Sequence, residues 1–333
     1  MSGPVAVVGA GSWGTALADL LARKGMPVRI WAWEQAVVDG INRSRENPVY
    51  LKGIALSEHL EATTSVRDAV AGCDTIVSVS PAQHVRAVID AASPSIEPGA
   101  TVISASKGIE KGTLDTMSQV LDEVLPDSCV TAFLSGPSFA TEVARGLVTA
   151  VTVASDDEAA ALHAQALFQT SYFRVYTSDD VIGVELGGAL KNVIAIAAGM
   201  AVGLGLGHNA TAALITRGLA EIARLGTALG AKAMTFSGLA GMGDLILTCT
   251  GDLSRNRTVG VALGQGRTLP DILAGMTMVA EGIDTTVGAH ALARREGVEM
   301  PIVEAVHAVL FEGRTARDVL ETLMLREPKP EFG

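Results

Sequence analysis

The sequence predicts an α/β protein, with a doubly wound, mostly parallel sheet in an N-terminal domain and an all-α C-terminal domain. Through the first 180 residues, short β-branched runs alternate with helical segments, which is typical of βαβ units. A glycine-rich stretch at 9–14 directly follows the first run and opens a helix. After about Ser178, strand-like runs become scarce and long Ala, Leu and Gly segments with helical spacing replace them. We therefore expect two domains, 1–180 and 181–333.

Six strands are expected in the N-terminal domain, each a short apolar run rich in Val, Ile or Thr. They are predicted at 4–8, 28–31, 74–79, 101–104, 130–134 and 150–154. Start signals mark the helices between them. Ser65 is followed three residues later by an acid, and Ser80 stands before Pro81 at an expected first helical position. Residues 156–158 place acid at the start of a helix that we expect to run through Leu167.

The C-terminal domain begins with a favourable helix entry, the run Ser-Asp-Asp at 178–180. Helical spacing then predicts segments at 181–202, 209–229, 258–265, 270–275, 284–296, 302–312 and 315–325. The 25 residues between Lys191 and Arg217 carry no formal charge, a length that could span a bilayer. Its purely apolar part, 193–207, has only 15 residues and several glycines, so we expect a buried helix and no membrane span.

Composition and charge exclude several classes of protein. The chain has 333 residues, 48% of them hydrophobic, so bulk disorder is excluded and two domains are expected. The net charge of −11 argues against nucleic acid as the main partner, because phosphate backbones require a basic surface. Three distant cysteines without a Cys/His cluster predict neither a disulfide framework nor a metal site. The N-terminus lacks the features of a signal peptide, so we expect a cytoplasmic protein.

Residues 9–14, GAGSWG, fit the dinucleotide-binding pattern GxGxxG in the context that the pattern requires, between a strand and a helix. Gly9 permits the tight turn, Gly11 lets a pyrophosphate approach the backbone, and Gly14 lets the helix pack on the sheet. The helix N-terminus offers free N–H groups and a partial positive charge to the phosphates. We therefore expect a Rossmann-like domain that binds NAD or NADP.

Glu34 lies 20 residues after Gly14, where an acid commonly binds the adenosine ribose. A carboxylate there accepts a hydrogen bond from the ribose 2′-hydroxyl and repels a 2′-phosphate, which favours NAD. Arg43 and Arg45 are close enough in sequence to bind such a phosphate, so NADP stays open.

Two segments follow predicted strands, at the edge of the sheet where ligands bind in open α/β folds. Lys107, in SKG at 106–108, can meet an anionic substrate or a developing alkoxide; the alternative is a solvated loop lysine. Residues 135–140, SGPSFA, offer hydroxyl and backbone N–H donors before a helix start, although a cap and turn explain them equally well.

Lys191 is a candidate general acid/base on the first long C-terminal helix. A cationic side chain inside an apolar helix costs free energy unless it is paired or functional, and a snorkelling lysine is the alternative. Gly187 and Gly188 lie one turn earlier on the same face and are expected to leave a hollow beside the lysine. Burial and cationic neighbours would lower the pKa of Lys191 towards neutrality, which suits acid/base catalysis.

A further segment, 241–249, places Asp244 where it could pair with a catalytic lysine. Arg255 and Asn256 follow in SRNR at 254–257 and could grip a phosphate, with the guanidinium able to do so bidentately. The alternative for both is a polar loop between helices.

These motifs occur together in a fixed order: GAGSWG at 9–14, SKG at 106–108, GPSFA at 136–140, GGALKNV at 187–193, GLAGMGDLILTC at 238–249, SRNR at 254–257 and VAEG at 279–282. In this conjunction, over residues 4–325, the sequence resembles the soluble, bacterial-type NAD(P)-dependent sn-glycerol-3-phosphate dehydrogenases. The resemblance implies reduction of dihydroxyacetone phosphate to sn-glycerol 3-phosphate, a supply for phospholipid synthesis, and a homodimer.

The resemblance also assigns roles to individual residues. Lys191 matches the catalytic proton donor and acceptor. From this match we expect Asp244 to orient Lys191, and Lys107 and Asn192 to help polarise or position the carbonyl. Besides the glycine loop and Glu34, the implied cofactor contacts are Ser12, Trp13, Trp33, Lys107, Ala140, Arg255, Val279 and Glu281. The implied substrate contacts are Lys107, Gly136, Ser138, Lys191, Asn192, Asp244, Ser254, Arg255 and Asn256. Trp33 stands where relatives often carry His or Arg, so the choice between NAD and NADP stays open.

Two alternatives remain at this stage. One is another two-domain dehydrogenase of the same architecture, of the 3-hydroxyacid or 6-phosphogluconate type. Arg255, Asn256 and Asp244 favour a small phosphorylated ketone over it. The other is a nucleotide-binding redox sensor without turnover, which could dispense with both Lys191 and Asp244.

Overall fold

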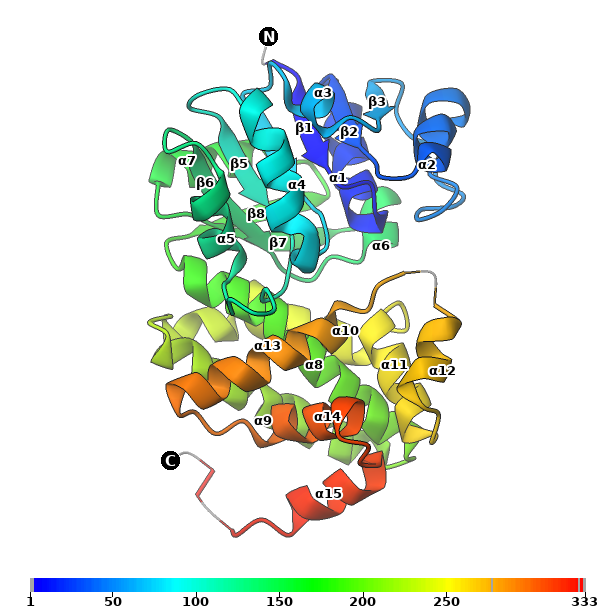
Figure 1. The fold of residues 1–333 in the computed structure, drawn as a ribbon, viewed down its shortest axis with the longest axis vertical. Coiled ribbons are helices and arrows are strands. Elements are labelled where there is room, and N and C mark those ends of the chain that lie inside the picture. The colour runs from blue at the N-terminus through cyan, green and yellow to red at the C-terminus, as the bar shows by residue number, and fades with distance from the viewer. Residues whose placement is uncertain (1–2, 277, 329, 332–333) are drawn as a thin grey trace.

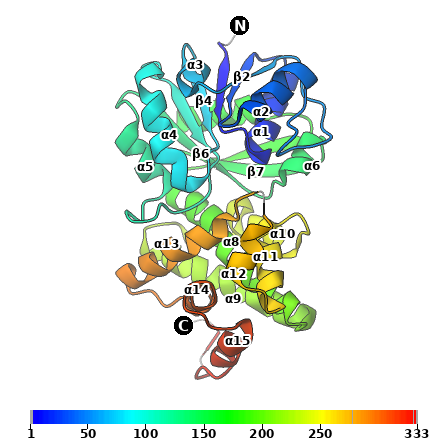
Figure 2. The ribbon, with the colours of Figure 1, turned by 45° about the vertical axis from the view of Figure 1, so that its right-hand side comes forward.

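The computed structural model describes residues 3–276, 278–328 and 330–331 and consists of two halves, one built on a sheet and the other of helices (Figures 1 and 2). An eight-stranded sheet runs in the order β3-β2-β1-β4-β5-β6-β7-β8. All neighbouring strands are parallel except β6 and β7. The strands are β1 Val5–Val8, β2 Val28–Trp31, β3 Leu60–Thr63, β4 Thr75–Ser78, β5 Thr101–Ser104, β6 Val130–Ser135, β7 Thr149–Ala154 and β8 Phe173–Ser178.

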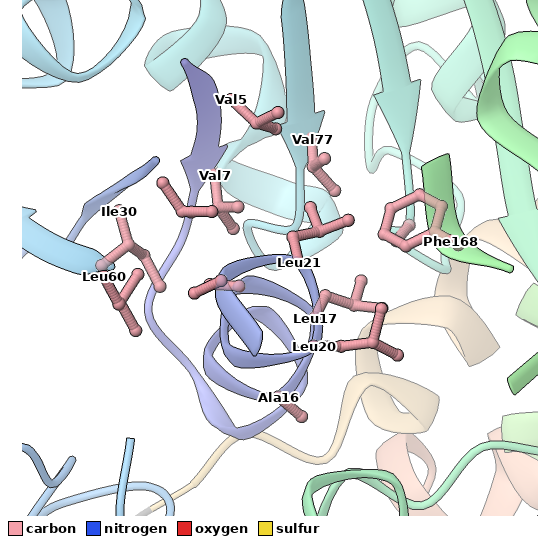
Figure 3. Close-up of a cluster of buried hydrophobic side chains, with 14 of the residues drawn as sticks. Val5, Val7, Ala16, Leu17, Leu20, Leu21, Ile30, Leu60, Val77 and Phe168 are labelled. Atoms are coloured by element: carbon pink, nitrogen blue, oxygen red, sulfur yellow. The ribbon is translucent and has the colours of Figure 1, made fainter. Parts of the chain in front are cut away.

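Helices cover both faces of the sheet, and successive residues of β1 belong to different cores. Val5 and Val7 pack in one core with α1 and α7, where Leu17, Leu21 and Phe168 are buried (Figure 3). Ala6 and Val8 pack in a second core with α3, α4 and α5. This alternation follows from the two-residue period of a strand. The helices of this half are α1 Ser12–Arg23, α2 Gln35–Asp39, α3 Val66–Val70, α4 Val85–Ala92, α5 Met117–Val124, α6 Ala140–Ala144 and α7 Glu158–Phe168, with short turns η1 Gly40–Ser44, η2 Ala82–His84 and η3 Ser93–Ser95.

The helical half is built around α8, Val181–Gly203, whose first residues still pack in the second core of the sheet half. The helix is long and apolar enough to cross a membrane, but 89% of its most apolar window is buried inside the molecule. It is therefore the central helix of this half. The other elements of the half are η4 Ala233–Ser237, η5 Leu239–Gly243, α9 Gly207–Ala228, α10 Asp244–Thr250, α11 Arg255–Gly264, α12 Leu269–Ala274, α13 Glu281–Glu296, α14 Pro301–Phe311 and α15 Ala316–Met324.

Glycines bring α8 and α11 into direct backbone contact. A Cβ atom on Gly199 would lie 2.2 Å from the carbonyl oxygen of Arg257, and one on Gly260 would lie 2.0 Å from that of Ile196. Part of the glycine content therefore serves this helix packing, which fixes α11 beside the middle of α8.

The predicted fold class and all six predicted strands are confirmed within one or two residues at each end. Two strands were missed. β3 is a short edge strand without an apolar run, and β8 alternates buried with exposed residues, so only its period of two could have revealed it. The cap predicted at Ser80 is wrong: its hydroxyl donates to the carbonyl of Val8, and Pro81 adopts an extended conformation before a 3₁₀ turn.

Three other helix starts agree with expectation. Ser65 accepts a hydrogen bond from the backbone N–H of Asp68, Asp157 from that of Ala160, and Asp180 from that of Gly183. Asp180 also accepts from the backbone N–H of Lys232 at 2.9 Å, which ties the start of α8 to the start of η4.

Candidate active site

The glycine loop between β1 and α1 has the geometry of an anion site. Gly9 adopts a φ of +122°, which side chains disfavour, and a Cβ on Gly14 would lie only 1.8 Å from the carbonyl oxygen of Gly9. Gly11, by contrast, faces open space, with no atom within 4 Å of a built Cβ. Gly11 is also the N-cap of α1 and makes no side-chain cap. The first turn of α1 therefore has N–H groups without a side-chain cap, next to open space at Gly11.

The segment after η1 packs against this loop, and no local sequence pattern distinguishes it. Asn47 is fully buried and donates to the carbonyl of Ala10 and to the hydroxyl of Thr15, each at 2.9 Å. The hydroxyl of Ser12 donates to the carbonyl of Tyr50 at 2.6 Å. The phenol of Tyr50 in turn donates to Glu34 at 2.5 Å. Asn47 and Tyr50 were both missed, because their roles depend on contacts across 16 to 38 residues.

Trp13 and Trp33 differ in environment. The indole nitrogen of Trp13 is buried without a hydrogen-bond partner, which is a free donor beside the loop. Trp33 is 81% exposed and contacts Trp31 edge to face, with ring centroids 6.4 Å apart. An exposed aromatic face beyond β2 is a surface on which a planar base can stack.

Lys191, Asp244 and Lys107 meet at one buried carboxylate. The ammonium of Lys191 on α8 lies 2.5 Å from Oδ1 of Asp244, which begins α10. Lys107 comes from the loop after β5, in the other half, and lies 2.7 Å from Oδ2 of the same carboxylate. The Asp244 side chain is only 1% exposed. The carboxyl end of the sheet and the centre of the helical half therefore meet here.

The surroundings of Lys191 change its proton affinity. Burial lowers the pKa of Lys191 to about 8, Asp244 opposes this shift, and the charge of Lys107 reinforces it. The direction agrees with the sequence prediction. Thr248 adds a contact that was not predicted: its hydroxyl donates to the carbonyl of Asp244 at 2.7 Å and accepts from Lys191 at 2.9 Å. Thr248 lies one helical turn after Asp244, a spacing from which this contact could have been inferred.

The hollow predicted beside Lys191 is not there. A Cβ on Gly187 would lie 2.7 Å from the carbonyl oxygen of Ala240, and one on Gly188 would lie 2.4 Å from the hydroxyl of Ser135. The two glycines instead let η5 and the end of β6 contact α8 directly. They position the neighbours of Lys191 and leave no empty space.

Gly136 and Ser138 lie beside Lys107. The Lys107 ammonium donates to the carbonyl of Gly136 at 3.2 Å, and the Ser138 hydroxyl donates to the same carbonyl at 3.0 Å. Gly136 has a φ of +143°, and a Cβ there would lie 2.9 Å from Cα of Val151. Ala140 begins α6 directly after this turn.

Asn192 and Asn256 form a buried amide pair next to Lys191. The Asn256 amide donates to Oδ1 of Asn192 at 2.9 Å and accepts from the backbone N–H of Gly282 at 3.0 Å. Ser254 caps α11 by accepting from the backbone N–H of Arg257, which leaves its own hydroxyl proton free to donate. Arg255, the first residue of α11, is exposed and forms no ion pair within the described residues.

Glu281 and Val279 lie where α13 approaches the start of α4. Glu281 accepts a hydrogen bond from the backbone N–H of Ala82, and burial raises its pKa to about 7. A cavity of about 90 Å³ lies between the two halves here, lined by Pro81, Ala82, Gln83, His84, Val279, Glu281, Asp284 and Thr285. Lys111 pairs with Asp284 across the same boundary. Among the described residues no cluster of three or more His, Cys, Asp or Glu side chains could hold a metal ion.

Comparison with known proteins identifies the family. Two family models match, the NAD-dependent glycerol-3-phosphate dehydrogenase N-terminus over residues 4–161 and its C-terminus over residues 180–321. The chain belongs to this family. It is an NAD(P)-dependent oxidoreductase, because curated relatives of the same length share this description throughout.

Relatives match the chain over its full length. Glycerol-3-phosphate dehydrogenase [NAD(P)+] from Geobacter metallireducens is 56% identical over all of both chains. The Myxococcus xanthus protein of the same name is 53% identical over 98% of both. The crystal structure of glycerol-3-phosphate dehydrogenase from Coxiella burnetii superposes with a TM-score of 0.94, at 41% identity over 98% of this chain and 99% of that one. D-mandelate dehydrogenase, at 13% identity and a TM-score of 0.62, shares the fold alone.

Proposed function

We propose that the chain catalyses the reversible, NAD(P)H-dependent reduction of dihydroxyacetone phosphate to sn-glycerol 3-phosphate, with Lys191 as the general acid/base. One observation carries the mechanism: Lys191 and Lys107 come from opposite halves and share the buried carboxylate of Asp244. The names of the relatives, which cover the whole chain, support the substrate.

The cofactor, when bound, supplies a hydride to C2 of the ketone. Lys191 gives a proton to the C2 oxygen as the alkoxide develops. With a pKa of about 8, most Lys191 side chains are protonated at neutral pH, yet the proton is held weakly enough to be transferred. In the oxidation of the alcohol, the neutral amine takes the same proton back.

Asp244 and Lys107 set the charge around this proton. Asp244 holds the ammonium of Lys191 in one direction and compensates part of its buried charge. Lys107 leaves a net positive charge at the carboxylate, which stabilises a developing alkoxide. Asn192 and Asn256 are proposed to position the carbonyl and the phosphate from their buried amide pair.

The phosphate of the substrate is proposed to bind at the start of α11. Arg255 provides an exposed guanidinium there, and Ser254 and the helix N-terminus provide O–H and N–H donors. Binding energy at the phosphate, which does not react, then serves to orient C2 against Lys191.

Three further properties belong to the same proposal: a cytoplasmic location, a homodimer, and delivery of the product to phospholipid synthesis. Sedimentation of the purified full chain tests the dimer, since a monomer mass at micromolar concentration would contradict it. Cell fractionation tests the location. Depletion of the enzyme, followed by labelling of glycerophospholipids, tests the metabolic role.

A substrate panel tests the activity itself. The absorbance of NADH and of NADPH is followed with dihydroxyacetone phosphate, with unphosphorylated dihydroxyacetone, and with the 3-keto form of a hydroxyacid. We expect turnover with the phosphorylated ketone alone. Equal rates on the unphosphorylated ketone would contradict a role for Arg255, and binding without turnover would indicate a sensor.

A further inference from the structure

The hydrogen bond between Tyr50 and Glu34 is the starting point. Glu34 is the N-cap of α2 and follows β2 by three residues, the place where an acid meets the adenosine ribose in this fold. Its Oε1 accepts from the Tyr50 phenol at 2.5 Å, and its Oε2 makes no hydrogen bond with any described residue. One carboxylate oxygen is therefore fixed by the protein and the other is available to a ligand.

Tyr50 is itself held firmly in place. Asn47, fully buried, accepts hydrogen bonds from the backbone N–H groups of Val49 and Tyr50 while its amide nitrogen donates to the glycine loop at Ala10. Ser12 adds a second link through the carbonyl of Tyr50. The loop that carries Tyr50 is thus tied to the glycine loop, so a dinucleotide with its phosphates at the glycine loop would meet a Glu34 held in place by Tyr50.

The two cations between Glu34 and Tyr50 each contact another group, and Lys52, two residues after Tyr50, is exposed. The two cations are Arg43 and Arg45. Arg43 points into solvent and pairs with Asp39 at 3.6 Å. Arg45 donates to the carbonyl of Leu60 at 2.7 Å. Trp33, on the other side of Glu34, presents an uncharged aromatic face.

We propose that Tyr50 is a positioning residue that fixes Glu34 against the adenosine ribose and thereby makes the enzyme selective for NADH over NADPH. Oε2 of Glu34 accepts a hydrogen bond from the 2′-hydroxyl of NADH, whereas a 2′-phosphate meets the negative charge of a carboxylate that Tyr50 holds in place. This inference rests on the proposed function for its reaction, but it concerns binding alone. The hydrogen bond to Glu34 and burial raise the pKa of Tyr50 to about 12, so its phenol stays a donor across the working pH range.

The test compares dissociation constants of NADH and NADPH, measured on the full chain by fluorescence of the bound cofactor. We expect NADH to bind at least about tenfold more tightly, the difference that one charge-assisted hydrogen bond and one repulsion supply. Glu34→Gln should remove most of this preference, and Tyr50→Phe should reduce it about three- to tenfold. Tyr176→Phe, on the exposed face of β8, is the matched control and should leave the ratio unchanged.

If Tyr50 has only a structural role, Tyr50→Phe would weaken the binding of NADH and NADPH equally. The ratio of their dissociation constants would then be that of the wild type, which would overturn the proposal. Equal binding of the two cofactors by the wild type would overturn it as well. Turnover with dihydroxyacetone phosphate is measured separately. If it is absent while the binding ratio holds, the proposed reaction fails and the assignment of Glu34 and Tyr50 stands.

Discussion

Lys107 and Asp244, which are 137 residues apart in sequence, join the two halves of the molecule through an ion pair of 2.7 Å. The same carboxylate holds Lys191, so the site is complete only when the loop after β5 meets the start of α10. The pairing of Lys191 and the contact between the two halves at this point thus share one aspartate.

Replacing Asp244 should move the pH profile to lower pH. Asp244 raises the pKa of Lys191, so Asp244→Asn lowers it further below its value of about 8. Because reduction needs the protonated lysine, the alkaline decrease of kcat/KM for dihydroxyacetone phosphate should begin at a lower pH than in the wild type. The maximal kcat/KM should also decrease by about 100-fold. Steady-state rates across pH check this, with a thermal melt to verify folding; a limb that moves to higher pH would refute the assignment.

Replacing Lys107 should shift the same limb in the opposite direction. The charge of Lys107 lowers the pKa of Lys191, so Lys107→Met raises it, and the alkaline limb of the reduction moves to higher pH. The maximal rate should fall as well, because a positive charge near the alkoxide is lost. Lys111→Met, in the same loop but paired with Asp284, is the control that should leave the limb in place.

Substitutions of two glycines in the same loop should have different effects, one on cofactor binding and the other on stability. Gly11→Ala adds a methyl group to open space, so stability should stay within about 0.5 kcal/mol while the dissociation constant of NADH rises at least about tenfold. Gly14→Ala adds a methyl group that would lie 1.8 Å from the carbonyl oxygen of Gly9, and it should destabilise the fold by at least about 2 kcal/mol. Chemical denaturation and cofactor titration distinguish the two, and a Gly11→Ala variant with normal binding would contradict the phosphate site.

A buried carboxyl group should make stability depend on pH. Glu221 on α9 accepts from the backbone N–H groups of Ile302 and Val303, and burial raises its pKa to about 7. The folded-state pKa of Glu221 lies above its unfolded value. The contribution of Glu221 to the free energy of unfolding is therefore fully present below about pH 4.5 and is lost as the pH rises through 7. In Glu221→Gln, the free energy of unfolding should decrease over this pH range by on the order of 2 kcal/mol less than in the wild type.

Denaturant unfolding at about pH 5.5 and about pH 8.5 measures the effect of Glu221. The exposed Glu61→Gln on β3 serves as the control for removing a carboxylate. If the free energy of unfolding changes equally between the two pH values in the wild type and in Glu221→Gln, Glu221 stays ionised in the folded protein, which would contradict the prediction.

Local patterns were sufficient to predict six of the eight strands, the glycine loop and the lowered pKa of Lys191. Each depends on neighbours in sequence: an apolar run, a turn that needs glycine, or a lysine in an apolar helix. The ion pair of Lys191 and Asp244 was predicted because each stood in a motif of its own. The edge strand β3 was missed because its four residues carry too few apolar groups to form a pattern.

Contacts between distant loops could not be read in this way. Asn47 and Tyr50 look like ordinary loop residues until the fold brings them to the glycine loop. The filled space beside Gly187 and Gly188 likewise depends on Ala240 and Ser135, which only the tertiary structure brings there.

The central claim is that Lys191 transfers the proton, and one substitution tests it directly. Lys191→Met removes the ammonium but keeps most of the length of the side chain, and it leaves Lys107 as a partner for Asp244. Lys232→Met, which removes an exposed lysine, is the control. The account predicts that kcat for dihydroxyacetone phosphate falls by about 10³-fold in Lys191→Met, with the dissociation constant of NADH within about twofold of the wild type. A folded Lys191→Met enzyme with near wild-type turnover would contradict it.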